Sequence, residues 1–445
     1  MSRERNPRRP HAVPRPMARA PFWSACLAIA LLTASLVIAG IPAVTAAGSW
    51  KGQEVQKDGA LHVVNPASGF ENPVTVDLKE IFRLGGESES EEEFFGVIMR
   101  ITTDAKNNIY VLDTQLSEVK IYDTNGKYLK TIGREGEGPG EFRNPADMFF
   151  MPDGNIGVMQ VFPGKIVMLT ANGDPAGDYP LPKPEGDGFQ VLRGGRRCGS
   201  HLVLARQLQK MSEGKFTQNI SLDRLDLQGK VANTYVSMER ALDMANLVID
   251  EKTFSTWEQG GRWDAGNDGR VFVVTHNSNY EVTVFNADGT KDRVIERTYE
   301  KRNRTAEETA EIKSIYEAFT RQAPGAKVEV NSFDADINSV YSRDDGSLWV
   351  LTSRGSRNLP AGVLGVFDVF DDKGHFVRQV TMKGQGNAMK DGYFFVGDRL
   401  YVVTGWLDAV MAMQGGGAKQ ETDTETSPME LICYRVEAPV VAKGK

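Results

Sequence analysis

The sequence predicts an all-β fold, a six-bladed β-propeller with one surface helix inserted between the fourth and fifth blades. A pattern of short strands and tight turns recurs about every fifty residues, and a sheet of this size cannot bury both of its apolar faces alone. The 45 glycines of the 445-residue chain suit a fold that is dense in turns. Six alternating or β-branched runs mark the expected second strands of the blades: Ile109–Leu112, Ile156–Met159, Leu202–Ala205, Val271–Val274, Leu348–Leu351 and Leu400–Val403.

The residues before most of these runs accept the positive φ of tight hairpins, which supports the strand assignments. They are Asn107-Asn108, Asp153-Gly154-Asn155, Asp268-Gly269 and Asp345-Gly346.

The first 46 residues form an expected export signal, and residues 47–445 form a single propeller domain. Six arginines precede an uncharged apolar stretch from Ala20 to Ala47, and Val44 and Ala46 are small residues at −3 and −1 of a cleavage site. The expected location is therefore periplasmic or extracellular. An uncleaved membrane anchor is the alternative, since the apolar run is rather long.

Loss of this segment changes the net charge from −7 to −12, because it removes six Arg and one Glu. An acidic protein lacks the basic face that phosphates require, so no nucleic-acid partner is expected. Cys198 and Cys433 fall in the third and sixth repeats, on opposite sides of the ring, and two buried free thiols are expected.

Two insertions and one leading segment interrupt the repeats. Thr305 and Glu308 form a capping box before apolar residues at helical spacing, which predicts a surface helix over 305–319. Residues 414–428 are Gly-rich and then polar, which predicts a disordered loop. The strand-like segment 62–84 is expected to complete the last blade and so remove a free sheet edge.

The segment Gly138-Pro-Gly-Glu-Phe142, followed by Asn144-Pro145 and Asp153-Gly-Asn-Ile156, resembles the NHL-repeat propellers, in particular their exported bacterial six-bladed branch. The resemblance covers the first two blades and continues only as a pattern beyond them. Asp147 stands where the family usually has a glycine. The resemblance implies the fold, and propellers of this kind include binding modules, lyases and lactone hydrolases.

Charged residues recur at the expected start of the innermost strands, which line the central channel. The position nine residues before each second strand holds Arg100, Asp147, Arg193, Arg262, Ser339 and Asp391. Charges that are gathered away from water must pair or meet a ligand. Pairing at a solvated channel mouth is one interpretation, and an anion site built from Arg100, Arg193 and Arg262 is the other.

A second candidate ring follows the second strands, where loops of one face gather. Its polar members are Asp113, Gln160, Arg206 and, in the fourth blade, His276. Such a ring suits a glycan or peptide surface and also resembles an ordinary solvated loop ring.

No metal or cofactor is expected. The exported chain keeps His62, His201, His276 and His375, and these occupy unlike positions in their repeats, whereas a zinc lyase needs three converging ligands. Asp334-Ala-Asp336-Ile-Asn338 begins like a calcium loop but lacks its glycine and closing glutamate.

The preferred interpretation is an exported, non-enzymatic propeller that binds an anionic ligand, either a glycan or a peptide, or a partner protein on its channel face. The rival is a hydrolase or lyase with a metal-assisted site at the channel, in which Asp147, Asp391 and His276 would supply acid, base or metal ligands.

Overall fold

The computed structural model describes residues 48–437, apart from residues 185, 213–214, 255–256, 259–260, 321–322, 324 and 414–427. The expected export segment and almost all of the predicted disordered loop at 414–428 lie outside the described residues.

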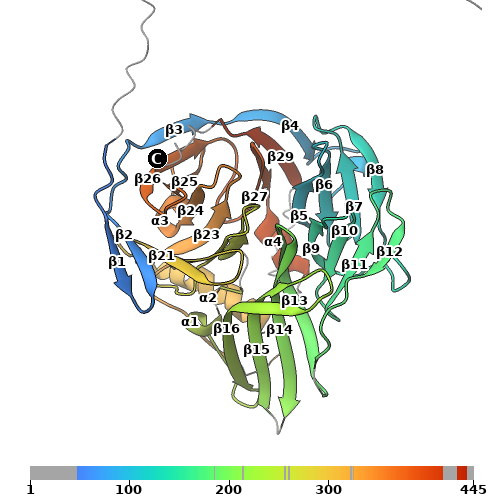
Figure 1. The fold of residues 1–445 in the computed structure, drawn as a ribbon. Coiled ribbons are helices and arrows are strands. Elements are labelled where there is room, and N and C mark those ends of the chain that lie inside the picture. Colours follow the sequence, from blue (N-terminus) through green and yellow to red (C-terminus); the bar gives the residue numbers. More distant parts are fainter. Residues whose placement is uncertain are drawn as a thin grey trace, which may run out of the picture. The chain divides into compact units, whose positions relative to one another are not determined.

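Six sheets surround an axis as the blades of a propeller, as predicted, and the four successive strands that begin each sheet pair antiparallel (Figure 1). Blade 1 has β5 (Ile98–Thr103), β6 (Ile109–Asp113), β7 (Glu118–Tyr122) and β8 (Tyr128–Ile132). Blade 2 has β9 (Pro145–Phe150), β10 (Ile156–Gln160), β11 (Lys165–Leu169) and β12 (Pro175–Asp178). Blade 3 has β13 (Phe189–Cys198), β14 (His201–Ser212), β15 (Lys215–Leu225) and β16 (Val231–Asp243).

The other three blades also contain strands from the start of the described chain. Blade 4 has β18 (Trp263–Ala265), β19 (Val271–Val273), β20 (Glu281–Phe285) and β21 (Lys291–Arg297), and then β2 (Ala60–Asn65) and β1 (Gln53–Lys57). Blade 5 has β23 (Ile337–Ser342), β24 (Leu348–Thr352), β25 (Val363–Phe370) and β26 (Phe376–Lys383), and then β3 (Val74–Asp77). Blade 6 has β27 (Gly392–Val396), β28 (Arg399–Val403), β29 (Glu430–Arg435) and β4 (Lys79–Gly85).

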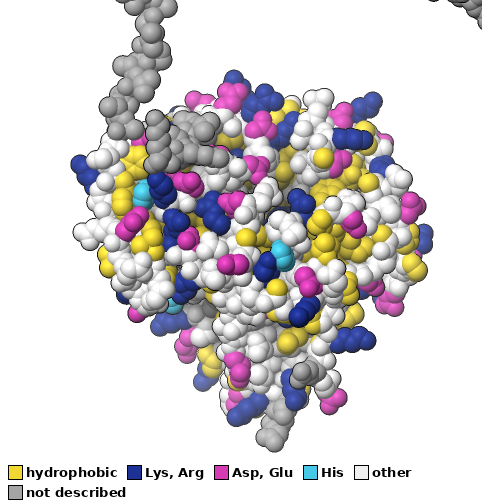
Figure 2. All heavy atoms as spheres, viewed as in Figure 1, with side chains coloured by type: hydrophobic (Ala, Val, Ile, Leu, Met, Phe, Trp, Pro, Cys, Tyr) yellow, Lys and Arg dark blue, Asp and Glu magenta, His cyan; other side chains and the backbone are white. Residues whose placement is uncertain are grey.

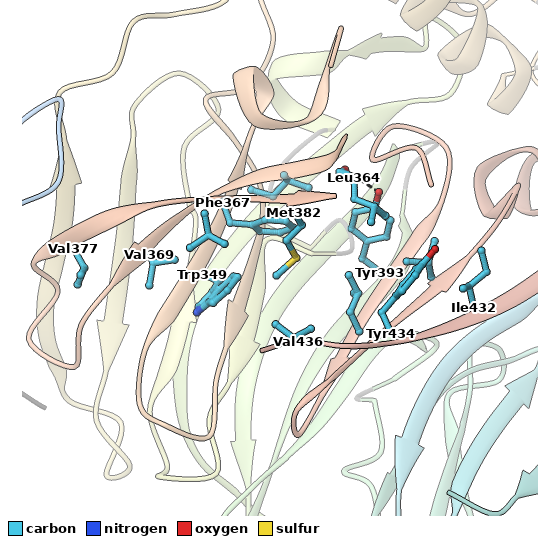
Figure 3. Packing of buried hydrophobic residues seen from close by; sticks show 14 residues of the cluster. Trp349, Leu364, Phe367, Val369, Val377, Met382, Tyr393, Ile432, Tyr434 and Val436 are labelled. Carbon is cyan, nitrogen blue, oxygen red and sulfur yellow. Dashed lines mark hydrogen bonds between the residues drawn. The ribbon is translucent and has the colours of Figure 1, made fainter. Parts of the chain in front are cut away.

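The second strands are buried on both faces, which is why they read as apolar runs rather than as alternating ones. In β6, Ile109 and Val111 pack toward blade 6, whereas Tyr110 and Leu112 pack toward blade 2. Six apolar clusters result, one between each pair of neighbouring blades. Figure 3 shows the cluster between blades 5 and 6, in which Trp349, Phe367 and Tyr434 are large contributors. The core is therefore a ring of interfaces between sheets.

The segment before blade 1 runs along the outer edges of three blades and closes the ring. β2 pairs in parallel with β21, β3 pairs in parallel with β26, and β4 pairs antiparallel with β29. The prediction that segment 62–84 completes the last blade is confirmed for β4. The sequence did not indicate that β2 and β3 extend blades 4 and 5.

Asn65, at the end of β2, holds this leading segment between blades 4 and 5. Its side-chain amide donates to the carbonyl oxygens of Glu296, at 3.0 Å, and Gly374, at 2.9 Å. Its Oδ1 accepts from the Phe376 backbone N–H at 2.7 Å and from Trp50 Nε1 at 2.8 Å. Asn65 is 1% exposed, so water cannot replace these partners.

The helices lie in the connections between strands: α1 (Glu251–Phe254), α2 (Ala306–Phe319), α3 (Ser353–Ser356) and α4 (Trp406–Met413), with one 3₁₀ turn at Glu91–Glu93. α2 is the predicted surface helix, and the capping box of Thr305 and Glu308 is present. α4 was not predicted from the sequence. A short parallel pair, β17 (Val248–Asp250) and β22 (Lys327–Glu329), accompanies α1 and α2.

Cys198 and Cys433 are both free and buried, as predicted. Burial raises the pKa of each thiol to about 11, so both remain protonated at neutral pH.

We predict that Asn65→Ala lowers the free energy of unfolding by about 2–4 kcal/mol, because it leaves buried backbone groups of two blades without partners. Denaturant unfolding of the purified variant measures this loss. Asn172→Ala, in an exposed turn of blade 2, serves as the matched control and should change stability by less than about 0.5 kcal/mol. A similar loss in both variants would contradict the role given to Asn65.

Candidate functional site

The four α-helices in the described part of the chain lie on one face of the propeller. In a four-stranded antiparallel blade, the loop between the second and third strands and the crossover to the next blade emerge on the same side. α3 and α4 lie in loops of the first kind, while α1 and α2 lie in crossovers. The opposite face carries the tight turns, such as Asp153-Gly154-Asn155. The loop-bearing face is therefore the candidate binding face.

A chain of charged side chains links the innermost strands of four consecutive blades. Arg100 Nε of β5 lies 3.3 Å from Asp147 Oδ1 of β9. Asp147 Oδ2 lies 2.7 Å from Arg196 Nη1 of β13, and Arg196 Nε lies 3.2 Å from Asp264 Oδ1 of β18. Asp264 Oδ2 accepts the backbone N–H of Ser342 in β23, which extends the chain to blade 5. We call these four charged residues the channel charge chain.

The surroundings of the channel charge chain keep its two arginines charged. Burial alone would lower the pKa of Arg196, but the carboxylates of Asp147 and Asp264 raise it above its usual value. Burial and the nearby Arg196 lower the pKa of Arg100 to about 10, which still leaves it charged at pH 7. Asp147 also accepts the Gly195 backbone N–H at 3.0 Å. The structure therefore favours the pairing interpretation for Arg100 and Asp147.

Arg193 differs from the other predicted arginines because its side chain is exposed. The register of β13 against β14 shifts between Leu192 and Gly194, so Arg193 occupies a β-bulge, a feature that redirects a side chain. Its Nε donates to Gln207 Oε1 at 2.9 Å. No carboxylate contacts this guanidinium among the described residues. Burial lowers the pKa of Arg193, and the charges of Glu258 and Arg240 act on it in opposite directions.

Two exposed aromatic rings lie on the same strand as Arg193 and on the neighbouring blade. Phe189 lies four residues before Arg193 in β13, so about 13 Å of strand separates the two residues. Phe189 is 37% exposed and Phe162 is 58% exposed, and their ring centroids are 5.6 Å apart. These two rings form a small exposed apolar surface at the start of β13.

Arg262 and Asp391 both immediately precede innermost strands, as predicted, and each finds a different partner. Arg262 is buried, and its guanidinium donates to Asn277 Oδ1. Asp391 accepts backbone N–H groups from Asn387, at 2.6 Å, and Gly405, at 2.9 Å, while burial raises its pKa. Ser339 lies within β23.

The predicted ring after the second strands consists mainly of buried structural groups. Asp113 is fully buried and accepts the backbone N–H groups of Gly96 and Val97. Gln160 Oε1 accepts the Arg143 N–H, and its amide donates to the Phe162 carbonyl. These contacts hold the loops of the binding face in place.

The other two members of that ring lie in opposite environments. Arg206 forms a buried ion pair with Asp223, at 2.7 Å from Nε to Oδ2. The side chain of His276 is 58% exposed, 4.0 Å from Glu281.

Sequence reasoning missed Arg196 and Asp264, and it considered Asp336 only as part of the segment that begins like a calcium loop. A count of nine residues back from each second strand gives one position per blade, which is Arg193 in blade 3. Arg196 lies three residues further along the same strand and contacts both Asp147 and Asp264. Asp336 is 4% exposed, and its Oδ1 has no hydrogen-bond partner among the described residues. Burial raises the pKa of Asp336 to about 6, against a smaller lowering by Lys301. Its neighbour Asp334 instead pairs with Arg302 and Arg304 and does not take part in a calcium loop.

A surface hollow of about 340 Å³ lies between blades 4 and 5. Arg297, Tyr299, Arg354 and Gln379 are among its lining residues. Arg297 pairs with the buried Asp368, which also accepts from Tyr280 and Gln379, so the charges of this hollow are largely satisfied within the protein.

The surface seen in Figure 2 carries interspersed basic and acidic side chains, with no large area of one sign. Among the described residues, no group of three or more His, Cys, Asp or Glu side chains is arranged to hold a metal ion. The described helices are too short or too polar to cross a membrane.

Comparisons with known proteins give limited further information. A family model described as a 6-bladed beta-propeller (DUF5128) matches residues 89–182, the region of blades 1 and 2. The same region carries the resemblance to NHL-repeat propellers. Membership of the NHL-repeat family stays a prediction. No curated protein matches the sequence.

Solved structures with similar chain paths are distant in sequence. A presumed exported protein from Bacteroides fragilis is 12% identical, with a TM-score of 0.45, and the match covers 82% of this chain and 100% of that one. A member of the duf4221 family from Bacteroides vulgatus is 13% identical, with a TM-score of 0.44 and coverage of 80% and 97%. A luciferin-regenerating enzyme is 13% identical, with a TM-score of 0.41 and coverage of 81% and 100%.

We predict that Asp147→Ala lowers the free energy of unfolding by about 3–5 kcal/mol, because it leaves Arg100 and Arg196 partly buried without a shared carboxylate. Denaturant unfolding measures the loss. Asp187→Ala removes an exposed carboxylate of the adjoining loop and should have little effect. A loss below about 1 kcal/mol for Asp147→Ala would show that the channel charge chain is dispensable.

Asp336 makes stability depend on pH. In the folded protein its pKa of about 6 lies above the usual carboxyl value of about 4. Ionisation of the buried carboxyl therefore lowers the free energy of unfolding as the pH rises from about 4 to 6, and the loss stays constant at higher pH. Asp336→Asn should raise stability at pH 7.5 by about 1–3 kcal/mol and have little effect at pH 4. Unfolding midpoints at both pH values test this, with the exposed Asp58→Asn as control. A destabilising effect of Asp336→Asn at pH 7.5 would mean that the carboxylate has a partner.

Proposed function

We propose that this protein is an exported, non-enzymatic propeller that binds an anionic ligand on its loop-bearing face, with Arg193 as the principal contact. The observation that carries the proposal is the exposed Arg193 guanidinium on a β-bulge, with a neutral amide as its contact. Among the described residues, the terminal nitrogens of Arg193 have no hydrogen-bond partner, and the planar guanidinium matches the geometry of a carboxylate or sulfate.

The rigidity of the surroundings supports a binding role. Gly195 follows the bulge, and a Cβ atom there would lie 2.6 Å from the Phe149 ring, so the glycine permits close packing of blades 2 and 3. The neighbouring Gly195 N–H and Arg196 are both anchored on Asp147. A fixed backbone lowers the conformational entropy that Arg193 loses on binding.

The rival enzymatic interpretation receives less support from the contacts. Asp147 is engaged by two arginines and a backbone N–H, and Asp391 by two backbone N–H groups. His276 lies beside Glu281, on another blade from either aspartate. These three residues do not form the mutually hydrogen-bonded set that acid–base catalysis requires.

We predict that Arg193→Ala weakens binding of a carboxylated or sulfated ligand by about tenfold or more, because charge-assisted contacts contribute about 1.5–3 kcal/mol each. Calorimetric titration with uronic-acid and sulfated oligosaccharides and with acidic peptides, at low and moderate salt, measures the change. Arg197→Ala provides the matched control, since Arg197 is an exposed arginine of the same strand.

Three outcomes are informative. Loss of affinity in Arg193→Ala alone supports the site. Equal loss in both variants indicates a general charge effect. No binding of any of these anions by the wild-type protein, or unchanged binding by Arg193→Ala, overturns the proposal.

A further inference from the structure

Blade 3 is longer than every other blade and extends beyond them (Figure 1). Its four strands have 10, 12, 11 and 13 residues, whereas no other described strand exceeds 8. The apolar runs of the second strands begin at Ile109 in blade 1 and at Leu202 in blade 3, so Asp113, the last residue of β6, corresponds to Arg206. β14 continues to Ser212, which adds about 20 Å at about 3.4 Å per residue. Second strands end on the loop-bearing face, so blade 3 projects from that face.

The large apolar side chains that are exposed gather on the same face. Opposite it, Leu227 is the one such residue in the described part of the chain, and Val55 and Leu129 lie in outer edge strands. A surface of this kind on a charged protein is typical of an interaction site. The exposed large apolar residues in loops or strand ends of the loop-bearing face are Phe94, Phe162, Phe189, Met211, Met244, Val248 and Met413.

Four apolar side chains lie together where blade 3 projects. The strand registers place Met211, Phe216 and Leu242 in one row across β14, β15 and β16. The ring of Phe189 in β13 lies 6.2 Å from that of Phe216, measured between centroids. Met211 is 57% exposed and Phe189 is 37% exposed, while Phe216 and Leu242 are half-buried. We call these four residues the blade 3 tip.

Exposed lysines flank the blade 3 tip. Lys210 precedes Met211, and Lys215 precedes Phe216. Lys215 has Asp243 as its register partner on β16, whereas Lys210 has no acidic partner among the described residues. The apolar stems of lysines can lie along an apolar surface while their ammonium groups reach a polar boundary. The tip therefore combines exposed apolar surface with positive charge.

We propose that the blade 3 tip docks the protein on a lipid bilayer that carries anionic headgroups. Met211 and its apolar neighbours enter the boundary between headgroups and acyl chains, and Lys210 and Lys215 contact the headgroups. This goes beyond the binding of an anionic ligand by Arg193 and does not depend on it, because about 13 Å of strand separates Arg193 from Phe189.

The size of the blade 3 tip favours a bilayer over a protein partner. Each partner of a stable protein complex buries about 800 Å². From their exposed fractions, Met211 and Phe189 together expose about as much surface as one whole aromatic side chain, roughly 150–250 Å². The half-buried Phe216 and Leu242 add less than this. A bilayer takes up a few projecting side chains without a matching surface of its own.

The projection of blade 3 also suits an anionic surface. The acidic run from Glu87 to Glu93 lies in the crossover between blades 6 and 1, on the loop-bearing face, and would be repelled by anionic headgroups. The extension of about 20 Å exceeds the Debye length of about 8–10 Å at moderate salt. The tip can therefore reach the headgroups while the acidic run stays beyond the range of strong repulsion.

A dye at the blade 3 tip tests the contact directly. Met211→Cys, labelled with an environment-sensitive dye, should show a blue-shifted and stronger emission with vesicles of equal parts phosphatidylglycerol and phosphatidylcholine. Leu227→Cys, labelled in the same way, is the matched control and should show no change, because Leu227 lies on the opposite face. Wild-type protein treated with the dye gives the background, since its two described cysteines are buried.

Vesicle sedimentation measures the energetic contributions. Met211→Ser should weaken binding by about fivefold or more, because it removes an apolar side chain that leaves water on docking. Lys210→Ala should weaken binding by about fivefold with the phosphatidylglycerol vesicles and have little effect with phosphatidylcholine alone. Leu227→Ser and Lys127→Ala, at exposed positions of the opposite face, are the controls and should leave binding unchanged.

The outcomes separate the interpretations of the tip. Changes at position 211 and not at position 227, together with losses in the tip variants alone, support docking on a bilayer. Equal changes at both positions, or equal losses in tip and control variants, indicate non-specific adsorption and overturn the proposal. Unchanged emission at position 211 with both kinds of vesicle also overturns it, and a protein partner would then be the interpretation of the tip.

Discussion

Burial of both faces of every blade is the constraint on which the rest of the structure depends. Each sheet contributes apolar side chains to two neighbouring interfaces, so each blade needs a neighbour on both sides. A ring satisfies this only if the last blade meets the first, and the strand β4 completes blade 6 from the start of the folded chain. The leading segment then adds strands to blades 4 and 5, and Asn65 bonds it to both. The N-terminal segment is therefore hydrogen-bonded to three of the six blades.

The channel charge chain adds a polar constraint at the centre of the same ring. Its charges alternate in sign from Arg100 through Asp147 and Arg196 to Asp264, and they join blades whose innermost strands belong to different sheets. Partly buried ion pairs of this kind lose hydration free energy, and the attraction between the charges offsets this cost only when the geometry is good. Once these charges satisfy one another, the channel wall offers little net charge to a ligand. Arg193 lies on a bulge outside this chain, and we propose it as the ligand contact.

The fold could be predicted from the sequence because propeller blades repeat a local pattern. The six apolar runs correspond to the second strands, and the Thr305 capping box correctly located the start of α2. The parallel edge strands β2 and β3 could not be predicted, since their pairing depends on contacts more than two hundred residues away. The length of the four strands of blade 3, which have 10 to 13 residues, was not predicted from the sequence.

Prediction of the candidate site was less successful, because position in a repeat does not specify a partner. The fixed spacing located Arg100 and Asp147 at the channel but could not show that Arg196 pairs with both Asp147 and Asp264. A double-mutant cycle on Asp147 and Arg196, measured by denaturant unfolding, tests most directly whether the channel charges serve the fold. Our account predicts a coupling free energy of about 2 kcal/mol or more between the two side chains. Additivity within about 0.5 kcal/mol would contradict it and return the channel residues to consideration as ligand contacts.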